Sequence, residues 1–174
     1  MCQAERYKID LKGLTDEVTP LEYQIDDQFF SSVEEAQVQG GSLHVSGSIR
    51  KATGFYELQL LINGIVRIPC DRCLDLMDQP INTRLRLIIK LGTESREEDD
   101  DIIVIDKRDA TLDTSWYIYE AIVLAVPIQH VHQLGDCNVA MSEKLLQLSN
   151  ARSIDADAED IDPRWEVLKQ LKEK

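Results

Sequence analysis

Two cysteines separated by two residues are the part of the sequence best suited to chemistry. Cys70 and Cys73 lie in the run Pro-Cys-Asp-Arg-Cys-Leu, after a stretch of alternating apolar residues. Such a turn can present two thiolates to a tetrahedral zinc ion, which then needs two further ligands. His130, His132 and Cys137 follow later in the chain and can supply them. A zinc site is therefore one interpretation of this pattern.

The same cysteine pair has three other interpretations. A disulfide is unusual for a protein inside the cell. A thioredoxin-like redox pair normally precedes a helix whose N-terminus lowers the thiol pKa, whereas Asp75, Asp78 and Pro80 follow here. Two small buried thiols beside ordinary histidines are the third interpretation. The histidines and the cysteine at positions 130–137 slightly favour the metal site over these three interpretations.

Glu120 is a carboxylate within an apolar segment, between Tyr119 and Ala121. Burying it without a partner would be costly, so we expect a structural ion pair, a hydrogen bond or a partner contact, with Arg72 as a candidate. No second acid, activated nucleophile, phosphate loop or cofactor fingerprint accompanies it, which argues against catalysis.

The net charge of −13 is unevenly distributed. Residues 94–101 hold six acids and one arginine, net −5, and residues 153–162 hold five acids and no base, also −5. The rest carries −3, and residues 42–92, with seven bases and four acids, carry +3. The acidic runs are either a solvated loop and a linker, or segments that keep the protein off non-cognate RNA.

Basic residues recur at alternate positions of one predicted strand, as Arg84, Arg86 and Lys90. They form either a solvated outer face or a surface that follows RNA phosphates or contacts a protein. The absence of interleaved aromatic residues disfavours base stacking. Arg50 lies on a neighbouring strand, and the predicted contact residues are Arg67, Arg72, Arg84, Arg86 and Lys90.

Hydrophobic alternation predicts the strands that would position these side chains. It covers residues 42–50, 56–68, 81–91 and 102–105, with a turn at 51–54 and a glycine bulge at 63–64 rather than a hairpin. Short or polar links join the strands, and no helix of crossover length separates them. We therefore expect an antiparallel sheet, with the option of curling into a small barrel.

Helices are expected after the strands, which makes the fold class α+β. Residues 114–126 are apolar nearly all round, with Asp113 as N-cap and Pro127 as stop, so this helix should be buried on several sides. Residues 141–148 form a short helix. Residues 1–150 would be one domain, and residues 151–174 an acidic linker and a short C-terminal amphipathic helix. The apolar stripe of that helix is Trp165, Leu168 and Leu171.

Three motifs occur in the order seen in the YceD-like family of large ribosomal RNA subunit accumulation proteins, which this chain resembles from Ser42 onward. They are PCDRCL, EAIVLAVP running into HVHQLGDC, and DPRWEVLKQLK. On this resemblance zinc would be held by Cys70, Cys73, His132 and Cys137, because His130 has no match. Some relatives carry extra cysteines that this chain lacks. The matching positions are Cys70, Arg72, Cys73, Glu120, Pro127, His132 and Cys137.

The resemblance implies a non-enzymatic role in accumulation or processing of large-subunit (23S) ribosomal RNA and in assembly of the large ribosomal subunit. The implied partners are the rRNA precursor or an early assembly particle, together with ribosomal proteins. We expect no small-molecule substrate. Because no apolar run approaches the roughly 20 residues that cross a bilayer, we expect a cytoplasmic protein without a membrane partner.

Two other classes of function stay open. A protein-only adaptor or regulator would bind ribosomal proteins through the acidic segments and the C-terminal helix. A thiol-dependent enzyme would use Cys70 or Cys73. RNA footprinting distinguishes an RNA-binding factor from the adaptor, and alkylation of the thiols tests the enzyme.

Overall fold

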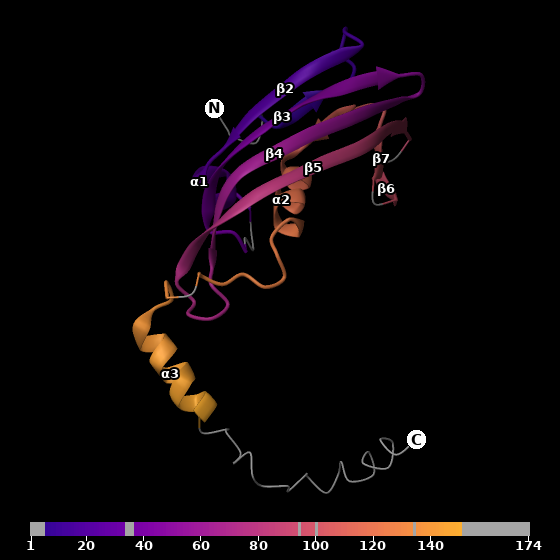
Figure 1. Ribbon diagram of the computed structural model, residues 1–174. Helices are drawn as coiled ribbons and strands as arrows, with labels where there is room; N and C mark the ends of the chain where they lie inside the picture. The colour runs from indigo at the N-terminus through magenta and orange to yellow at the C-terminus, as the bar shows by residue number, and fades with distance from the viewer. Residues whose placement is uncertain (1–5, 34–36, 94, 100, 134, 151–174) are drawn as a thin grey trace, which may run out of the picture. The chain divides into compact units, whose positions relative to one another are not determined.

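The computed structural model describes residues 6–33, 37–93, 95–99, 101–133 and 135–150 of the 174-residue chain. The chain divides into two compact units, Met1–His132 and Gln133–Lys174. The first unit contains all the described strands with helices α1 (Asp27–Ser31) and α2 (Ser115–Leu124) (Figure 1). The second contains helix α3 (Val139–Asn150), which confirms the predicted short helix.

The predicted boundary at residue 150 stays a prediction. Its second part, residues 151–174, lies outside the described residues. The predicted C-terminal helix and its stripe of Trp165, Leu168 and Leu171 therefore have no structural account here.

In the described residues, eight strands form two sheets. Strands β1 (Lys8–Asp10) and β8 (Thr111–Asp113) pair in a small antiparallel sheet. The other six form a sheet in the order β2-β3-β4-β5-β7-β6. These six are β2 (Val18–Ile25), β3 (Gly40–Ala52), β4 (Phe55–Pro69), β5 (Leu76–Gly92), β6 (Arg96–Asp99) and β7 (Ile102–Asp106).

The large sheet is mixed, so the expectation of an antiparallel sheet was wrong in one place. Residues 88–92 of β5 pair in parallel with β7. No crossover helix is needed, because β6 runs antiparallel to β7 on its far side and carries the chain back before β7 begins. The acidic run at 94–101, which we expected to be a loop, therefore contains a strand. The sheet has β2 and β6 as its two edges and does not close into a barrel.

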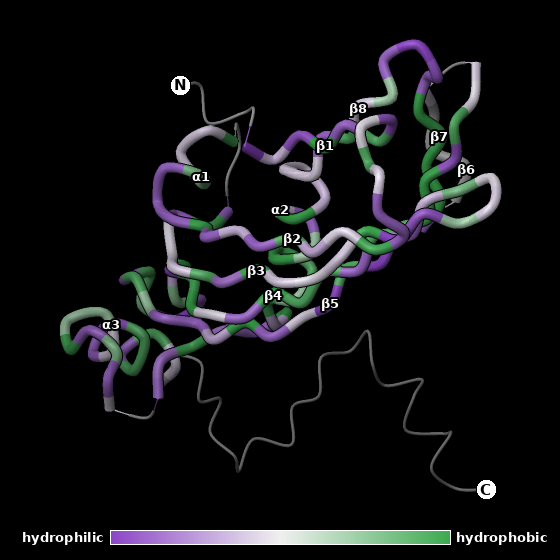
Figure 2. Tube along the Cα trace, turned by 90° about the horizontal axis from the view of Figure 1, so that it is seen from above, coloured by the Kyte–Doolittle hydropathy of each residue, from purple (hydrophilic) through white to green (hydrophobic). Residues whose placement is uncertain are grey.

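One face of the large sheet is buried and the other is exposed, as alternation predicts. In β4, Tyr56, Leu58, Leu60 and Ile62 are buried, and the residues between them are mostly exposed. The buried side chains of β3, β4 and β5 join those of α1 and α2 in one apolar cluster. Figure 2 shows apolar (green) stretches alternating with polar (purple) ones along these strands.

Gly64 lies within β4 without interrupting it. Its partners across the sheet are Leu43 in β3 and Ile81 in β5, and the register is unbroken on both sides. The predicted long strand is confirmed, and the predicted bulge is wrong. The φ of Gly64 is +155°, and a Cβ there would collide with the Ser42 carbonyl and lie 2.6 Å from the Cα of Leu43. Only glycine lets the two backbones approach so closely.

Helix α2 is shorter and more exposed than predicted. Ile118, Tyr119 and Ile122 are buried, but Trp116 and Leu124 are 56% and 78% exposed. Burial on several sides was therefore wrong, since the helix packs by one face only. Among the described residues, no helix is long and apolar enough to cross a membrane.

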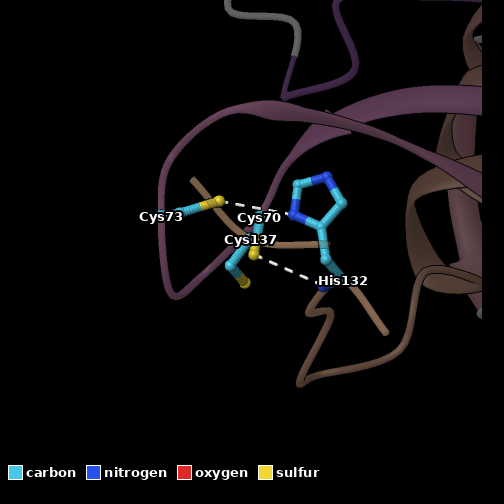
Figure 3. Close-up of side chains that lie close together, drawn as sticks. All are labelled: Cys70, Cys73, His132 and Cys137. Carbon is cyan, nitrogen blue, oxygen red and sulfur yellow. Dashed lines mark hydrogen bonds between the residues drawn. The ribbon is translucent and has the colours of Figure 1, made fainter. Parts of the chain in front are cut away.

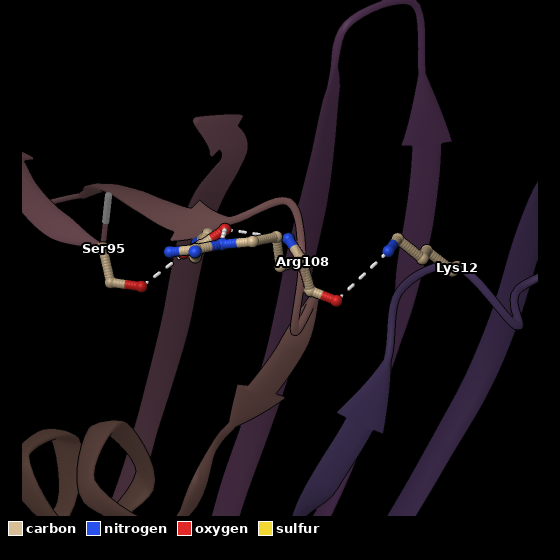
Figure 4. Close-up of polar contacts among 4 residues, drawn as sticks. Lys12, Ser95 and Arg108 are labelled. Atoms are coloured by element: carbon tan, nitrogen blue, oxygen red, sulfur yellow. Dashed lines mark hydrogen bonds and ion pairs between the residues drawn. The ribbon is translucent and has the colours of Figure 1, made fainter. Parts of the chain in front are cut away.

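The N-terminal strands β1 and β2 were not predicted, and aromatic side chains attach them to the core. The ring of Tyr7 lies 5.5 Å from that of Tyr23 and 5.2 Å from that of Phe29. Beyond β1, the ammonium group of Lys12 donates to the carbonyl of Arg108 at 3.3 Å (Figure 4). The Lys12 hydrogen bond holds the segment after β1 against the turn that follows β7.

Candidate metal site

The first half of the site is the hairpin loop that joins β4 to β5. Pro69 and Leu76 close the hairpin, so residues 70–75 form its loop. The Cys70 N–H donates to the Asp75 carbonyl, and the Leu74 N–H donates to the Cys70 carbonyl, both at 2.9 Å. This tight loop leaves the side chains of both cysteines buried.

The second half is the segment after α2, and Asp71 attaches it to the loop. The Asp71 carboxylate accepts a hydrogen bond from the His130 backbone N–H at 2.8 Å, and the Asp71 N–H donates to the His130 carbonyl at 2.9 Å. The His130 Nε2 lies 3.2 Å from the Asp71 Oδ1. Sequence reasoning named neither Asp71 nor this role for His130.

The hairpin loop and this segment bring a histidine to the two cysteines. The Sγ of Cys73 lies 3.3 Å from the Nδ1 of His132, and the His132 backbone N–H donates to the Sγ of Cys70 at 3.5 Å. Cys137 follows His132 by five residues. The four ligand atoms lie within 4.8 Å of one another (Figure 3). The prediction that these four residues lie close together is confirmed.

The size of the cluster matches a tetrahedral zinc site. Zn–S bonds of about 2.3 Å and Zn–N bonds of about 2.0–2.1 Å place ligand atoms roughly 3.5–3.8 Å apart at tetrahedral angles. The 3.3 Å between Cys73 and His132 already lies near this spacing. The largest separation, 4.8 Å at most, needs a contraction of roughly 1 Å. This Cys/His cluster could bind a metal.

Hydrogen bonds also favour the ligand form of Cys70. Burial raises the pKa of this thiol, but the backbone N–H groups of Cys73, His132 and Arg72 and the His132 side chain outweigh it and lower the pKa to about 6. The pKa of His132 is raised, chiefly by its hydrogen bond with Cys70. A thiolate is the form of cysteine that binds metal.

The family model "Large ribosomal RNA subunit accumulation protein YceD" matches residues 58–172. The chain belongs to this family. No curated protein and no solved structure matches this chain. The YceD match begins within β4, so it includes all four cluster residues, and the family's description links its members to accumulation of large-subunit ribosomal RNA.

Within the YceD match, the predicted basic residues are exposed but partly neutralised. Arg84, Arg86 and Lys90 lie on the exposed face of β5. The Nε of Arg86 donates to the Glu57 carboxylate at 2.9 Å. Arg67 forms an ion pair with Asp27. The side chain of Arg72 is exposed within the metal-site loop.

Glu120, also within the YceD match, differs from its predicted role. Its side chain is exposed on α2 instead of buried. In the described part of the chain it forms no ion pair with Arg72 or with any other residue. It lies at the wall of a hollow that Arg84 and Arg86 also line. The expected burial and ion pair were wrong, because α2 buries only one of its faces. The alternative of a contact with a partner stays a prediction.

Proposed function

We propose that this protein is a non-enzymatic factor that supports accumulation of large-subunit rRNA by binding its precursor or an early large-subunit particle. The observation that carries the proposal is the family match over residues 58–172, which spans the Cys/His cluster and the exposed basic face of β5. Processing of 23S rRNA and assembly of the large ribosomal subunit are the steps that such binding would serve.

In this proposal zinc has a structural role. A zinc ion held by Cys70, Cys73 and His132, with Cys137 as fourth ligand, would fix the β4–β5 loop to the segment after α2. All four ligand positions would be taken by protein, as in structural sites, and no position would stay open for substrate. A bound ion would supply no chemistry beyond holding these segments together.

Burial of the thiols argues against the thiol-enzyme alternative. Cys70 is 0% exposed and Cys73 is 3% exposed. A catalytic thiolate must reach its substrate, and reactive cysteines lie in partly exposed surroundings. The lowered pKa of Cys70 therefore fits a metal ligand better than a nucleophile.

The basic face of β5 is the part of the protein that we propose contacts RNA. Arg84 has no ion-pair partner among the described residues, and it projects from the same strand face as Arg86 and Lys90. Cationic side chains on an exposed sheet can follow a phosphate backbone without reading its bases. The ion pair with Glu57 weakens the contribution of Arg86.

Deletion and rescue in cells test the proposal. Cells without the protein should accumulate less mature large-subunit rRNA relative to small-subunit rRNA, and the wild-type chain should restore the ratio. A variant with Arg84, Arg86 and Lys90 changed to alanine should restore it less well. Normal ratios in the deletion strain, including under cold stress, would refute the proposed role.

A protein-only adaptor predicts the same rRNA deficit by a different route. The exposed apolar side chains of α2, Trp116 and Leu124, give this alternative specific support. The adaptor should co-sediment with particles but form no crosslinks to RNA. Crosslinking and sedimentation of one tagged chain therefore distinguish the two functions.

A further inference from the structure

Strand β5 has a free edge over half of its length. On one side it pairs with β4 from Leu76 to Lys90. On the other side it pairs with β7 from Ile88 onward only. Among the described strands, none pairs with this side of β5 before Ile88. An open edge of this kind is a template for another extended chain.

The backbone groups at this edge can be assigned. The N–H of Ile88 points to the β7 side, because it donates to the carbonyl of Asp101 at 2.7 Å. Backbone N–H and C=O groups alternate between the two edges of a strand, so those of Arg84 and Arg86 point to the same side as those of Ile88. In the described part of the chain, no backbone hydrogen bond from another segment reaches them on that side.

The free edge lines a groove. A hollow of about 800 Å³ lies between residues 83–87 of β5 and helix α2. The apolar side chains of Leu85 and Leu87 line it from the strand, and Trp116 and Leu124 line it from the helix. At about 3.3 Å per residue, five strand residues offer roughly 17 Å to an added strand.

Charge differs between the two faces of this edge. On the outer face, Arg84 is exposed and has no carboxylate partner among the described residues. In the groove itself the negative charges of Glu120 and Asp101 are offset by Arg84 and Arg86, which also line it. An occupant should therefore place a carboxylate beside Arg84 and apolar side chains toward α2.

We propose that residues 83–87 of β5 are a docking site for an extended segment of a partner protein, in which apolar and acidic side chains alternate. Main-chain hydrogen bonds to Arg84 and Arg86 would add the segment to the sheet, as in other cases of strand addition. The period of two in a strand sends apolar side chains to Trp116 and acidic ones to Arg84. This inference does not depend on the rRNA function.

RNA fits the groove less well than a peptide. Trp116 could stack on a base, but the carboxylates of Glu120 and Asp101 offset the charges of Arg84 and Arg86, so the groove offers a phosphate backbone no net positive charge. RNA also lacks the alternating amide groups that complete a strand edge. We therefore make RNA binding in this groove one outcome of the test.

Fluorescence anisotropy of the full chain with labelled synthetic peptides tests the proposal. A ten-residue peptide of alternating valine and glutamate should bind saturably, and one with lysine in place of glutamate about five-fold more weakly. The Arg84→Glu variant should reverse this order. The matched control is Arg50→Glu, which changes an exposed arginine on β3 instead of one on β5. It should leave the order of the two affinities unchanged.

Three results would overturn the proposal. The first is no saturable binding of either peptide. The second is undiminished binding of both of two methylated peptides, one with methylated amide nitrogens at its valines and the other at its glutamates, because one of these two sets must supply the donors that face β5. The third is a single-stranded RNA probe that binds with an affinity dependent on Trp116 while the peptides fail to displace it. Loss of binding of the valine–glutamate peptide in the Trp116→Ala variant would support docking in the groove.

Discussion

Cys70 combines complete burial with a pKa of about 6, which is an unusual pairing for a thiol. Burial alone keeps a thiol protonated, so the backbone N–H groups that point at its sulfur must compensate. Two of these donors are the N–H groups of Arg72, within the loop, and His132, from the segment after α2. The thiolate is thus favoured only when both segments are in place.

The purified chain should contain one zinc ion, and His132→Ala should remove it, because a tetrahedral site that loses a ligand loses most of its affinity. His44→Ala, on β3, is the matched histidine control and should keep the metal. Elemental analysis measures the content, and the wild-type melting temperature should fall under chelator. Wild-type protein without zinc after growth in zinc-replete medium would contradict the prediction.

Asp71 should act as a positioning residue for this site. Its carboxylate accepts a hydrogen bond from the His130 N–H, two residues before the histidine ligand. Asp71→Ala should therefore keep the zinc stoichiometry but weaken zinc affinity, by about tenfold, the lower end of the effect of residues that support metal ligands. Competition with a chromogenic chelator measures the affinity. An unchanged affinity would show that the loop is fixed without Asp71.

The ion pair of Asp27 with Arg67 makes stability depend on pH. The Arg67 guanidinium, with help from the Gly41 N–H, lowers the pKa of Asp27 below its usual value. The stabilisation is therefore fully present above the unfolded-state pKa of about 3.9 and is lost as the pH falls through the lower folded-state pKa. Asp27→Asn should destabilise the protein at neutral pH, and its difference from wild type should shrink below about pH 4.

A double variant checks the cause of this pH dependence. In an Arg67→Ala background, Asp27→Asn should change the free energy of unfolding less at neutral pH than it does in wild type. Denaturant titrations at several pH values measure both differences. Equal effects in the two backgrounds would show that Arg67 is not the source of the stabilisation.

At the scale of elements, the close approach of β3 and β4 at Gly64 should make the stability of the fold sensitive to a larger residue there. Gly64→Ala should destabilise the fold by about 2–4 kcal/mol, because the positive φ costs about 1 kcal/mol and the clash with the β3 backbone adds roughly 1–3 kcal/mol. Gly54→Ala shares the positive φ, but a Cβ there meets open space, so it should cost only about 1 kcal/mol. Urea unfolding compares them, and equal losses would exclude the clash.

Strong alternation predicts β3, β4 and β5, and a short apolar run predicts β7, whereas the sequence gives no clear signal for β1, β2, β6 and β8. The alternation in β3, β4 and β5 is strong because each strand places every second side chain in the core. Strand β2 lies at an edge, contains Pro20 and buries only two residues, so its alternation is weak. The parallel pairing of β5 with β7 was missed because β6 sits inside an acidic run that resembles a loop.

The site was only partly predictable for a related reason. Cysteine and histidine are common metal ligands, so their residue types alone allowed the four cluster residues to be predicted from the sequence. Asp71 lies in a turn, where aspartate is common for many reasons, and its bond to His130 spans 59 residues of sequence. The exposure of Glu120 depends on which face of α2 meets the sheet. A helix that is apolar nearly all round does not reveal that face.

At the scale of the whole molecule, RNA binding must overcome a net charge of −13. Changing Arg84, Arg86 and Lys90 to alanine should reduce the slope of log K against log salt by about 2–3, if each meets one phosphate. Changing Lys8, Lys12 and Arg108 to alanine gives the same net charge and is the control, because these residues lie on or beside the small sheet and the turn after β7. Equal slopes for both variants would show that only the net charge of the protein, and not the position of the three residues, affects RNA binding.

His132 follows Cys73 by 59 residues in the sequence, and this separation has a consequence for biosynthesis. Strands β2 to β5 each pair with their neighbour in sequence, so this part of the sheet can form while the chain is still being made. At about 5–20 residues per second, His132 is synthesised roughly 3–12 s after Cys73. During that interval two adjacent thiols have neither their histidine nor a complete set of ligands. A newly made chain is therefore most open to oxidation between these two cysteines before its synthesis is finished.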